Sequence, residues 1–230
     1  MQHIKQNLAE INNRIAEAAA KFGTSASDIM LVGVTKTIDE ARIAHLLECG
    51  VTNLGENRVQ ELLPKIDALG EKPTWHLIGH LQSNKARQVV GKVALIHSVD
   101  SLSLAKEIDA RATKAGIVQN ILIEVNAAGE DTKFGLAPND VCEFAKNITN
   151  FGNIRLNGLM TVAPFVENAE NNRVYFKKMY ELFVDIKQKI NDNIDMKYLS
   201  MGMTNDYDIA IEEGANIVRI GTGIFGERNY

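Results

Sequence analysis

The stretch Leu31-Val32-Gly33-Val34-Thr35-Lys36 is the first of eight short apolar segments, and a helical pattern follows each of the first seven. A β-branched run of this length predicts a strand, in which alternate side chains lie on opposite faces. Val32, Val34 and Lys36 then share one face, so that the lysine continues an apolar surface. Partial burial lowers the pKa of such an amine and exposes it for attack on a carbonyl carbon. The alternative is a lysine that marks the strand end and extends into solvent.

The rest of the chain repeats this order of strand and helix without a change in composition. Ile4, Leu8, Ile11 and Ile15 recur every three or four residues and predict a helix over residues 2–22, before the first strand. Eight alternations predict parallel strands, and eight is the number that closes a barrel. We therefore expect an α/β fold, one (β/α)8 TIM barrel over residues 1–230 with an extra N-terminal helix. An open doubly wound sheet is the alternative. The expected strands are 31–36, 52–57, 75–80, 94–99, 120–126, 154–160, 198–201 and 217–220, and the helices that follow them are 39–49, 58–69, 85–90, 101–116, 140–150, 169–190 and 206–213.

The composition is that of an ordinary globular protein. Of 230 residues, 45% are hydrophobic and 23% are charged, and the net charge is −4. Lysine and arginine are interspersed with acidic residues, which argues against a nucleic-acid partner. No apolar run reaches membrane-spanning length and the first residues are polar, so we expect a cytoplasmic protein without a membrane span or a signal peptide. Cys49 and Cys142 lack the paired spacing of metal or redox motifs and are expected to be buried thiols.

Two segments rich in glycine and hydroxyl groups follow the seventh and eighth expected strands. They are Ser200-Met201-Gly202-Met203-Thr204 and Gly221-Thr222-Gly223. In barrels of this type the same two loops often hold a phosphate. Thr204 or Asn205 is also expected to cap the next helix, whose N-terminus favours an anion. The alternative is that these glycines only make tight turns.

The segment from Gly221 to Gly226 also has the glycine spacing of a dinucleotide fingerprint. That motif requires a following helix and an acidic residue about 20 positions further on. Only four residues follow Gly226 in this sequence. We therefore do not expect a nicotinamide cofactor.

Arg219 lies one alternation before Gly221 and therefore on the same face of the eighth strand. An arginine stays protonated and has no acceptor, so beside a pyridine nitrogen it can only donate, and it leaves that ring a weak electron sink. If Lys36 and the two phosphate loops hold pyridoxal 5'-phosphate, Arg219 would disfavour carbanion chemistry. The alternative is an ion pair with Glu212, Glu213 or Glu227.

Other candidate residues are less specific. Asn57 ends the second strand, where it would hydrogen-bond a cofactor ring substituent or cap the next helix. His76 and His80 are four residues apart on a strand, without the glutamate of a metalloprotease helix, so we expect no metal site. His80 would then line the barrel mouth. Lys133 lies in a polar loop that we expect to be solvated, with transient cofactor transfer as the alternative.

Five segments together resemble the family of pyridoxal phosphate homeostasis proteins, over residues from about 31 to 230. They are Val34-Thr35-Lys36, Gly55-Glu56-Asn57-Arg58-Val59-Gln60-Glu61, Trp75-His76-Leu77-Ile78-Gly79-His80-Leu81-Gln82-Ser83-Asn84-Lys85, Leu199-Ser200-Met201-Gly202-Met203-Thr204 and Val218-Arg219-Ile220-Gly221-Thr222-Gly223-Ile224-Phe225-Gly226. The resemblance implies a barrel akin to that of alanine racemase, with pyridoxal 5'-phosphate held as an internal aldimine (a Schiff base). It implies a role in vitamin B6 homeostasis, in which the protein stores, buffers and delivers this cofactor.

The same resemblance implies roles for particular residues. Lys36 would bind the C4' carbon and Arg219 would face the pyridine nitrogen. Asn57 would lie beside the ring. The residues implied for the phosphate are Ser200, Gly221 and Thr222.

Three functions stay open at this stage. The first is a non-catalytic cofactor carrier that makes transient contacts with apoenzymes, and it is the one we expect. The second is a pyridoxal-phosphate-dependent amino-acid racemase, which needs a second acid or base from an added domain. No such domain follows Tyr230 in this sequence, although weak racemase activity stays open. The third is a cofactor-free Schiff-base aldolase. We expect a monomer, because the outer helices show no excess apolar patch.

Overall fold

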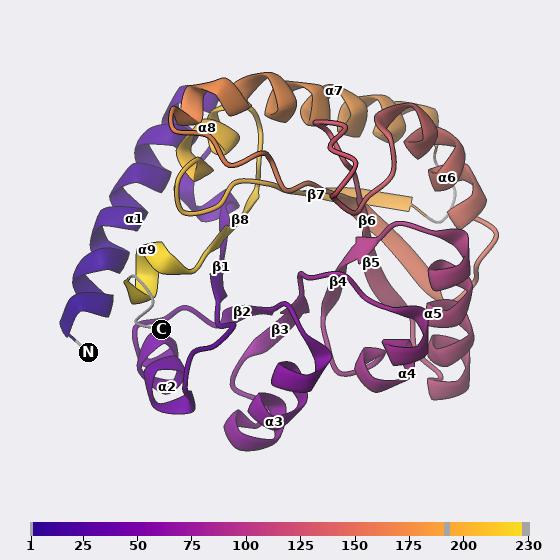
Figure 1. Cartoon of the computed structure of the whole chain (residues 1–230), viewed down its shortest axis with the longest axis horizontal. Helices are drawn as coiled ribbons and strands as arrows, with labels where there is room; N and C mark the ends of the chain where they lie inside the picture. The colour runs from indigo at the N-terminus through magenta and orange to yellow at the C-terminus, as the bar shows by residue number, and fades with distance from the viewer. Residues whose placement is uncertain (1, 191–193, 227–230) are drawn as a thin grey trace.

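Eight parallel strands close a barrel within residues 2–190 and 194–226, the part of the chain that the computed structural model describes. Each strand pairs with the next along the chain, and β8 returns to β1, where Met30 lies opposite Ile217 and Val32 opposite Arg219. This closed order confirms the expected barrel and excludes the open sheet (Figure 1). The strands are β1 (Met30–Val34), β2 (Asn53–Glu56), β3 (Thr74–Leu77), β4 (Leu95–Val99), β5 (Gln119–Glu124), β6 (Ile154–Met160), β7 (Ile194–Ser200) and β8 (Ile217–Ile220).

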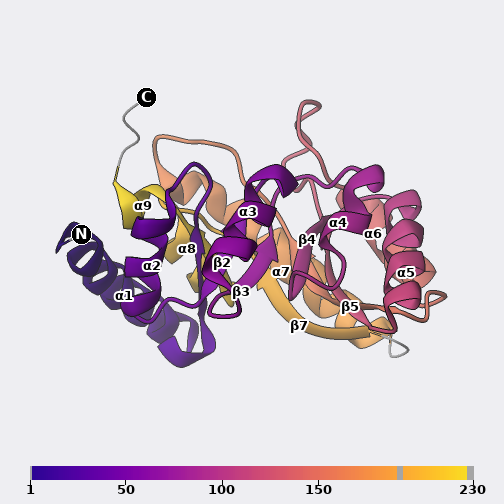
Figure 2. The ribbon, with the colours of Figure 1, turned by 90° about the horizontal axis from the view of Figure 1, so that it is seen from below.

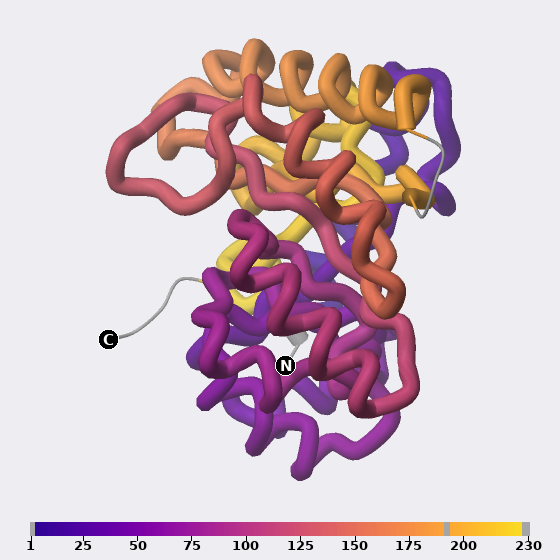
Figure 3. Tube along the Cα trace, turned by 90° about the vertical axis from the view of Figure 1, so that its right-hand side faces the viewer, coloured from indigo at the N-terminus to yellow at the C-terminus, as the bar shows by residue number. Residues whose placement is uncertain are grey.

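Helices surround the barrel, and α1 (Gln2–Phe22) precedes it as expected. In Figures 1 and 2, α1 lies beside α9 on the outside of the barrel. Figure 3 shows α7 as one long rod of successive turns along one side of the molecule. The other helices are α2 (Glu40–Glu48), α3 (Val59–Leu69), α4 (Ala86–Val89), α5 (Leu102–Ala115), α6 (Val141–Ile148), α7 (Arg173–Lys189), α8 (Tyr207–Glu212) and α9 (Thr222–Phe225). Single 3₁₀ turns are η1 (Ala26–Asp28), η2 (Ser83–Lys85), η3 (Pro138–Asp140) and η4 (Ala169–Asn172).

The apolar side chains form two buried clusters, one inside the barrel and one between the barrel and its helices. Val32, Leu95, Leu122, Met160 and Ile217 come from separate strands and meet inside. The larger cluster joins the outer strand faces to the helices. Val32 therefore points into the barrel. Alternation along β1 places every second side chain on this inner face, up to the end of the strand at the barrel mouth.

β1 ends two residues earlier than expected, so Lys36 lies in the turn after the strand. The Thr35 N–H still donates to Gly55 O of β2 (3.0 Å). Thr37, however, has φ 63°, a left-handed conformation that a strand cannot contain. The Thr37 N–H donates to Glu61 Oε2 (3.0 Å), and its hydroxyl donates to Lys36 O (2.6 Å). These bonds hold the turn that carries Lys36.

Several local expectations are wrong. β7 begins at Ile194 rather than at residue 198. Asp206 is the N-cap residue of α8 but makes no side-chain capping bond, and its carboxylate instead accepts the Met203 N–H (2.7 Å), so neither Thr204 nor Asn205 is the N-cap. A short helix, α9, follows β8 inside the glycine segment, where a phosphate-binding loop was expected. Helical periodicity cannot reveal a helix of a single turn.

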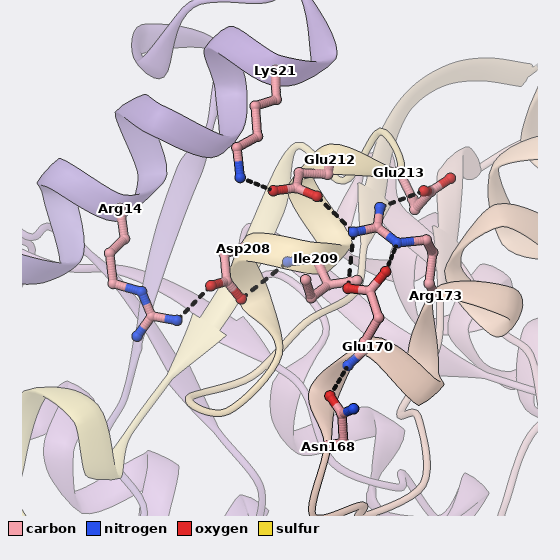
Figure 4. A network of polar contacts seen from close by, with 9 residues as sticks. All are labelled: Arg14, Lys21, Asn168, Glu170, Arg173, Asp208, Ile209, Glu212 and Glu213. Carbon is pink, nitrogen blue, oxygen red and sulfur yellow. Dashed lines mark hydrogen bonds and ion pairs between the residues drawn. The ribbon is translucent and has the colours of Figure 1, made fainter.

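A network of ion pairs on the outside of the barrel connects α1 and α7 to α8 (Figure 4). Lys21 Nζ donates to Glu212 Oε1 (2.7 Å), and Arg14 pairs with Asp208. Arg173 pairs with both Glu212 and Glu213 (2.7 Å each) and with Glu170. The alternative that Arg219 pairs with Glu212 or Glu213 is therefore wrong, and Glu227 lies outside the described residues.

Two expectations from composition can be compared with the structure. Among the described residues, none of the helices combines the length and the apolar character needed to cross a bilayer. Cys49 and Cys142 are free thiols, but they are half-buried at the edge of the outer cluster rather than in the core. The reason is their position: Cys49 is the C-cap residue that follows α2, and the Cys142 Sγ lies 3.7 Å from Asp185 Oδ2.

Candidate functional site

A cavity of about 220 Å³ opens where the strands end, at the mouth of the barrel. Lys36 borders it from the turn after β1, Arg219 from β8, and Gly221 and Thr222 from the start of α9. The fold thus brings four of the six predicted site residues to one cavity. The rest of the lining comes from β1, from the segment between β6 and α7, and from the loop after β7: Val34, Pro164, Phe165, Val166, Ala169, Asn172, Met203, Thr204, Asn205 and Asp206.

A buried ion pair supports the backbone next to Lys36. Lys65 Nζ on α3 donates to Glu56 Oε1 (2.6 Å) and to Thr35 O (2.7 Å), and the Thr35 hydroxyl donates to the same Glu56 oxygen (2.6 Å). Glu56 and Thr35 are fully buried and Lys65 is 6% exposed. Short hydrogen bonds to a buried charge restrict the peptide that they reach. The base of the Lys36 side chain is therefore held in place.

Arg219 lies deeper in the barrel, with its guanidinium in contact with two neighbouring strands. Its Nη1 donates to Ser200 Oγ (2.6 Å), and its Nη2 donates to Thr161 O (2.8 Å). Burial lowers the pKa of Arg219 to about 10, and the carboxylates of Glu124 and Asp206 oppose this shift. The side chain is therefore a cation at neutral pH. It presents only donors to anything bound in the cavity.

Glu124, at the end of β5, is the acidic counterpart of this buried cation. Burial raises the pKa of its carboxyl to about 7; Asp100 adds to the shift and Arg219 opposes it. Its Oε2 has no hydrogen-bond partner among the described residues. A carboxyl that titrates near neutral pH therefore lies within electrostatic reach of Arg219.

Hydroxyl and glycine groups from the loop after β7 and from the start of α9 meet beside the cavity. Thr204 Oγ1 accepts the Gly223 N–H (3.2 Å) and the Thr222 hydroxyl (3.1 Å), so it ties the loop after β7 to α9. A Cβ on Gly223 would lie 2.9 Å from Ile220 and 3.1 Å from Thr204, so only glycine allows this approach. The arrangement offers hydroxyls and backbone amides at a helix start, which suits a phosphate.

Thr204 borders the cavity, although Ser200 was the hydroxyl residue chosen from this segment for the phosphate. The sequence placed Thr204 in the expected phosphate segment and also as a possible helix cap. Three residues separate the two hydroxyl residues in that segment. Which hydroxyl faces the cavity depends on how the loop turns after β7. Local sequence does not specify that turn.

Ser200 and Asn57 are the two predicted site residues that do not border the cavity. Ser200 is fully buried, and its Oγ lies between Arg219 and His97. Asn57 is half-buried in a separate groove with His80 and Lys85. Arg58 rather than Asn57 is the N-cap of α3, which excludes the capping alternative.

The histidines and the second lysine lie in different environments. His76 points into the barrel beside His97, whereas His80 stacks on Phe134 outside it, with ring centroids 3.7 Å apart. Lys133 is half-buried rather than fully solvated, and its Nζ donates to Glu130 Oε1 (3.2 Å) and Ala163 O (3.3 Å). Over the described ranges, no three metal-ligating side chains gather at one point.

The cavity offers three kinds of group at separate positions. Lys36 brings an amine that can react with a carbonyl carbon. Arg219 brings a buried donor, and the Thr204, Thr222 and Gly223 region brings small donors for an anion. Together these groups fit an aromatic aldehyde that carries a phosphate.

Comparisons with known proteins show the family of the chain. The family model described as "Alanine racemase, N-terminal domain" matches residues 2–229. A pyridoxal phosphate homeostasis protein of Aquifex aeolicus is 44% identical over 226 residues, 98% of this chain and 98% of that protein.

Two solved structures are also similar over nearly the whole chain. An unknown protein from Bifidobacterium adolescentis has a TM-score of 0.91 and 36% identity, covering 97% of this chain and 95% of that one. PipY of Synechococcus elongatus PCC7942, solved with PLP bound, has a TM-score of 0.84 and 31% identity, covering 97% and 100%. On these grounds the chain belongs to the pyridoxal phosphate homeostasis protein family, within the alanine racemase N-terminal domain family.

Proposed function

We propose that this chain binds pyridoxal 5'-phosphate in the cavity at the barrel mouth and keeps it in reserve for other enzymes. The observation that carries the proposal is the convergence of Lys36, Arg219, Gly221 and Thr222 on one cavity. Two relatives support it: the Aquifex relative is a pyridoxal phosphate homeostasis protein, and PipY was solved with PLP bound.

Each residue has a distinct role in this proposal. The Lys36 amine adds to the cofactor aldehyde, water leaves, and a carbon–nitrogen double bond joins protein and ligand. Gly221 and Thr222 hold the phosphate, and Thr204 takes the third phosphate contact because it borders the cavity. Ser200, which was expected to hold the phosphate, instead accepts from Arg219. Asn57 stays a proposed neighbour of the ring.

We propose binding without turnover, because Arg219 and the cavity lining disfavour catalysis. Bound pyridoxal phosphate supplies an electron sink, which is strong only when its ring nitrogen is protonated. Arg219 remains a cation with its pKa at about 10 and cannot supply a proton at neutral pH. The titratable side chains described along the cavity are Lys36, Asp206 and Arg219, of which Asp206 already accepts from Asn172 (2.8 Å) and Met203.

An absorbance spectrum before and after borohydride tests the covalent attachment. The wild type should show a visible band that borohydride removes, because borohydride reduces the carbon–nitrogen double bond. Lys36→Ala should lose the band, and Lys133→Ala should keep it, because Lys133 pairs with Glu130 instead. A colourless wild type that pyridoxal phosphate cannot reconstitute would exclude the proposal. A band in Lys36→Ala would assign the attachment to another lysine.

Turnover and transfer assays separate a carrier from a racemase. The loaded protein should restore the activity of an apoenzyme and should leave L-alanine unracemised. We further propose that it acts as a cytoplasmic monomer with transient apoenzyme contacts. Sedimentation of the loaded and unloaded protein at one subunit mass would agree with this, whereas rapid racemisation would favour the enzyme alternative.

A further inference from the structure

A row of buried polar side chains crosses the inside of the barrel beneath the cavity. Arg219 Nη1 lies 2.6 Å from Ser200 Oγ, which lies 3.0 Å from His97 Nδ1 on β4. His97 Nε2 lies 3.0 Å from His76 Nδ1 on β3. His76 Nε2 lies 3.2 Å from Asn53 Oδ1 on β2. Arg219 borders the cavity, and Asn53 borders a groove beside Met30 and Tyr198, at the strand starts.

The two ends of the row, together with neutral rings, fix the direction of its hydrogen bonds. Asn53 Oδ1 is a carbonyl oxygen that can only accept, so His76 is protonated at Nε2 and donates to it. A neutral His76 then accepts at Nδ1 from His97 Nε2, and a neutral His97 accepts at Nδ1 from the Ser200 hydroxyl. At the other end Ser200 Oγ accepts from Arg219 Nη1, because a guanidinium only donates.

The surroundings agree with two neutral rings of this kind. His97 and Ser200 are fully buried, and His76 is 2% exposed. Burial lowers the pKa of His76 to about 4. Burial, together with His76 and Arg219, lowers the pKa of His97 well below its usual value. A proton added to His97 Nδ1 would also meet the Ser200 hydroxyl proton, for which this row offers no other acceptor.

We infer that Ser200, His97 and His76 form a one-directional hydrogen-bond chain that sets the orientation of Arg219, so that both histidines are positioning residues for the cavity. The guanidinium is held at two points, Ser200 Oγ and Thr161 O. Thr161 O is part of the backbone and stays in place. The Ser200 lone pair stays aligned with Nη1 only while His97 Nδ1 takes the hydroxyl proton. The consequence for the bound ligand rests on the proposed function.

The competing interpretation is that the row only satisfies buried polar groups. In that case a shape-filling substitution would change stability and leave the bound cofactor unaltered. In the chain that we infer, the same substitution changes how Arg219 meets the ligand. The two interpretations therefore differ in the spectrum and release rate of the cofactor.

The first test is ¹⁵N NMR of the histidine rings in the full chain, as purified and after pyridoxal 5'-phosphate is added. His76 and His97 should each carry one proton, on Nε2, in both samples. An Nδ1 proton or a doubly protonated ring at either position would overturn the chain. This result does not depend on cofactor binding.

The second test compares His97→Leu with His97→Gln in the loaded protein. His97→Leu removes the acceptor and should shift the visible band and speed cofactor release by about tenfold, the usual effect of one lost hydrogen bond. His97→Gln keeps an acceptor and a donor and should restore both. Asn157→Leu is the matched control, because Asn157 is buried on β6 and its side chain donates, among the described residues, only to Asp195 O (3.4 Å). It should lower stability without changing the band or the release rate.

The remaining outcomes also decide the inference. A folded His97→Leu protein with wild-type band and release rate would overturn it. If His97→Leu does not fold, Ser200→Ala removes the same link with one atom, and a wild-type band in that variant would overturn it too. If the wild type binds no cofactor, the proposed function fails. The ring protonation found by NMR then decides by itself whether the hydrogen-bond chain exists.

Discussion

At the scale of single residues, Lys65 and Glu56 form a buried ion pair. Breaking this pair leaves a buried charge without its partner. Lys65→Met removes the cation and leaves the fully buried Glu56 with the Thr35 hydroxyl as its remaining hydrogen-bond partner among the described residues. An uncompensated buried charge costs about 3–5 kcal/mol of the free energy of unfolding. Urea unfolding should show a loss of this size. The control is Lys21→Met, which breaks the exposed Lys21–Glu212 pair and should change stability little.

The raised pKa of Glu124 predicts that the free energy of unfolding depends on pH. Its pKa is raised to about 7 in the folded chain, so the folded state keeps a proton that the unfolded state loses above about pH 4.5. Stability contributed by this group is therefore lost as pH rises from about 4.5 to 7, by roughly 3 kcal/mol in all. His76 and His97 act in the opposite direction, because their lowered pKa values make acid destabilising below about pH 6.5.

The Glu124→Gln variant isolates the carboxyl from the histidines. The quantity to follow is the free energy of unfolding of the wild type minus that of the variant at each pH. This difference should become smaller as pH rises from about 4.5 to 7. A difference that is flat from pH 4.5 to 7 would contradict the raised pKa.

At the scale of the strand, the lack of a side chain at Gly158 allows β6 to pair with β7. A Cβ there would lie 1.8 Å from Tyr198 O, and its φ of 149° is one that other residues rarely adopt. It pairs with Tyr198 at a shift in the register between β6 and β7. Gly158→Ala should therefore cost at least about 3 kcal/mol or prevent folding. Gly152→Ala, which meets nothing within 4 Å, should stay within about 0.5 kcal/mol of wild type by thermal unfolding.

At the scale of the whole molecule, α1 connects the two ends of the sequence, because this first helix packs against α8 and α9 near the other end. Ile11 is 5% exposed in this contact, and Ile11→Ala should cost about 2–5 kcal/mol. Because α1 packs on elements that complete the barrel, calorimetry should show one transition shifted downward as a whole. A separate early transition would mean that α1 unfolds independently. Asn13→Ala, on the exposed face of α1, should leave the transition unchanged.

The sequence by itself determined the repeated order of strands and helices and brought Lys36 and Arg219 to one end of the barrel. Alternation predicted that Val34 and Lys36 share the inner face, and both border the cavity, although β1 ends at Val34 and Lys36 lies in the turn after it. The same rule placed Arg219 and Gly221 together, and both border the cavity. These inferences succeeded because they depend on neighbours along the chain. The periods of strand and helix are local properties, and eight repeats allowed a closed barrel.

Only the tertiary structure decided which polar side chains meet. Ser200 faces Arg219 and His97 while Thr204 faces the cavity, and no local pattern distinguishes the two hydroxyls. Lys65 reaches Glu56 from α3, and His76 meets His97 across two strands. These contacts depend on barrel closure, strand register and loop course, which bring distant residues within hydrogen-bond distance. Periodicity carries no information about such pairs, and so the support of the site was visible only in the fold.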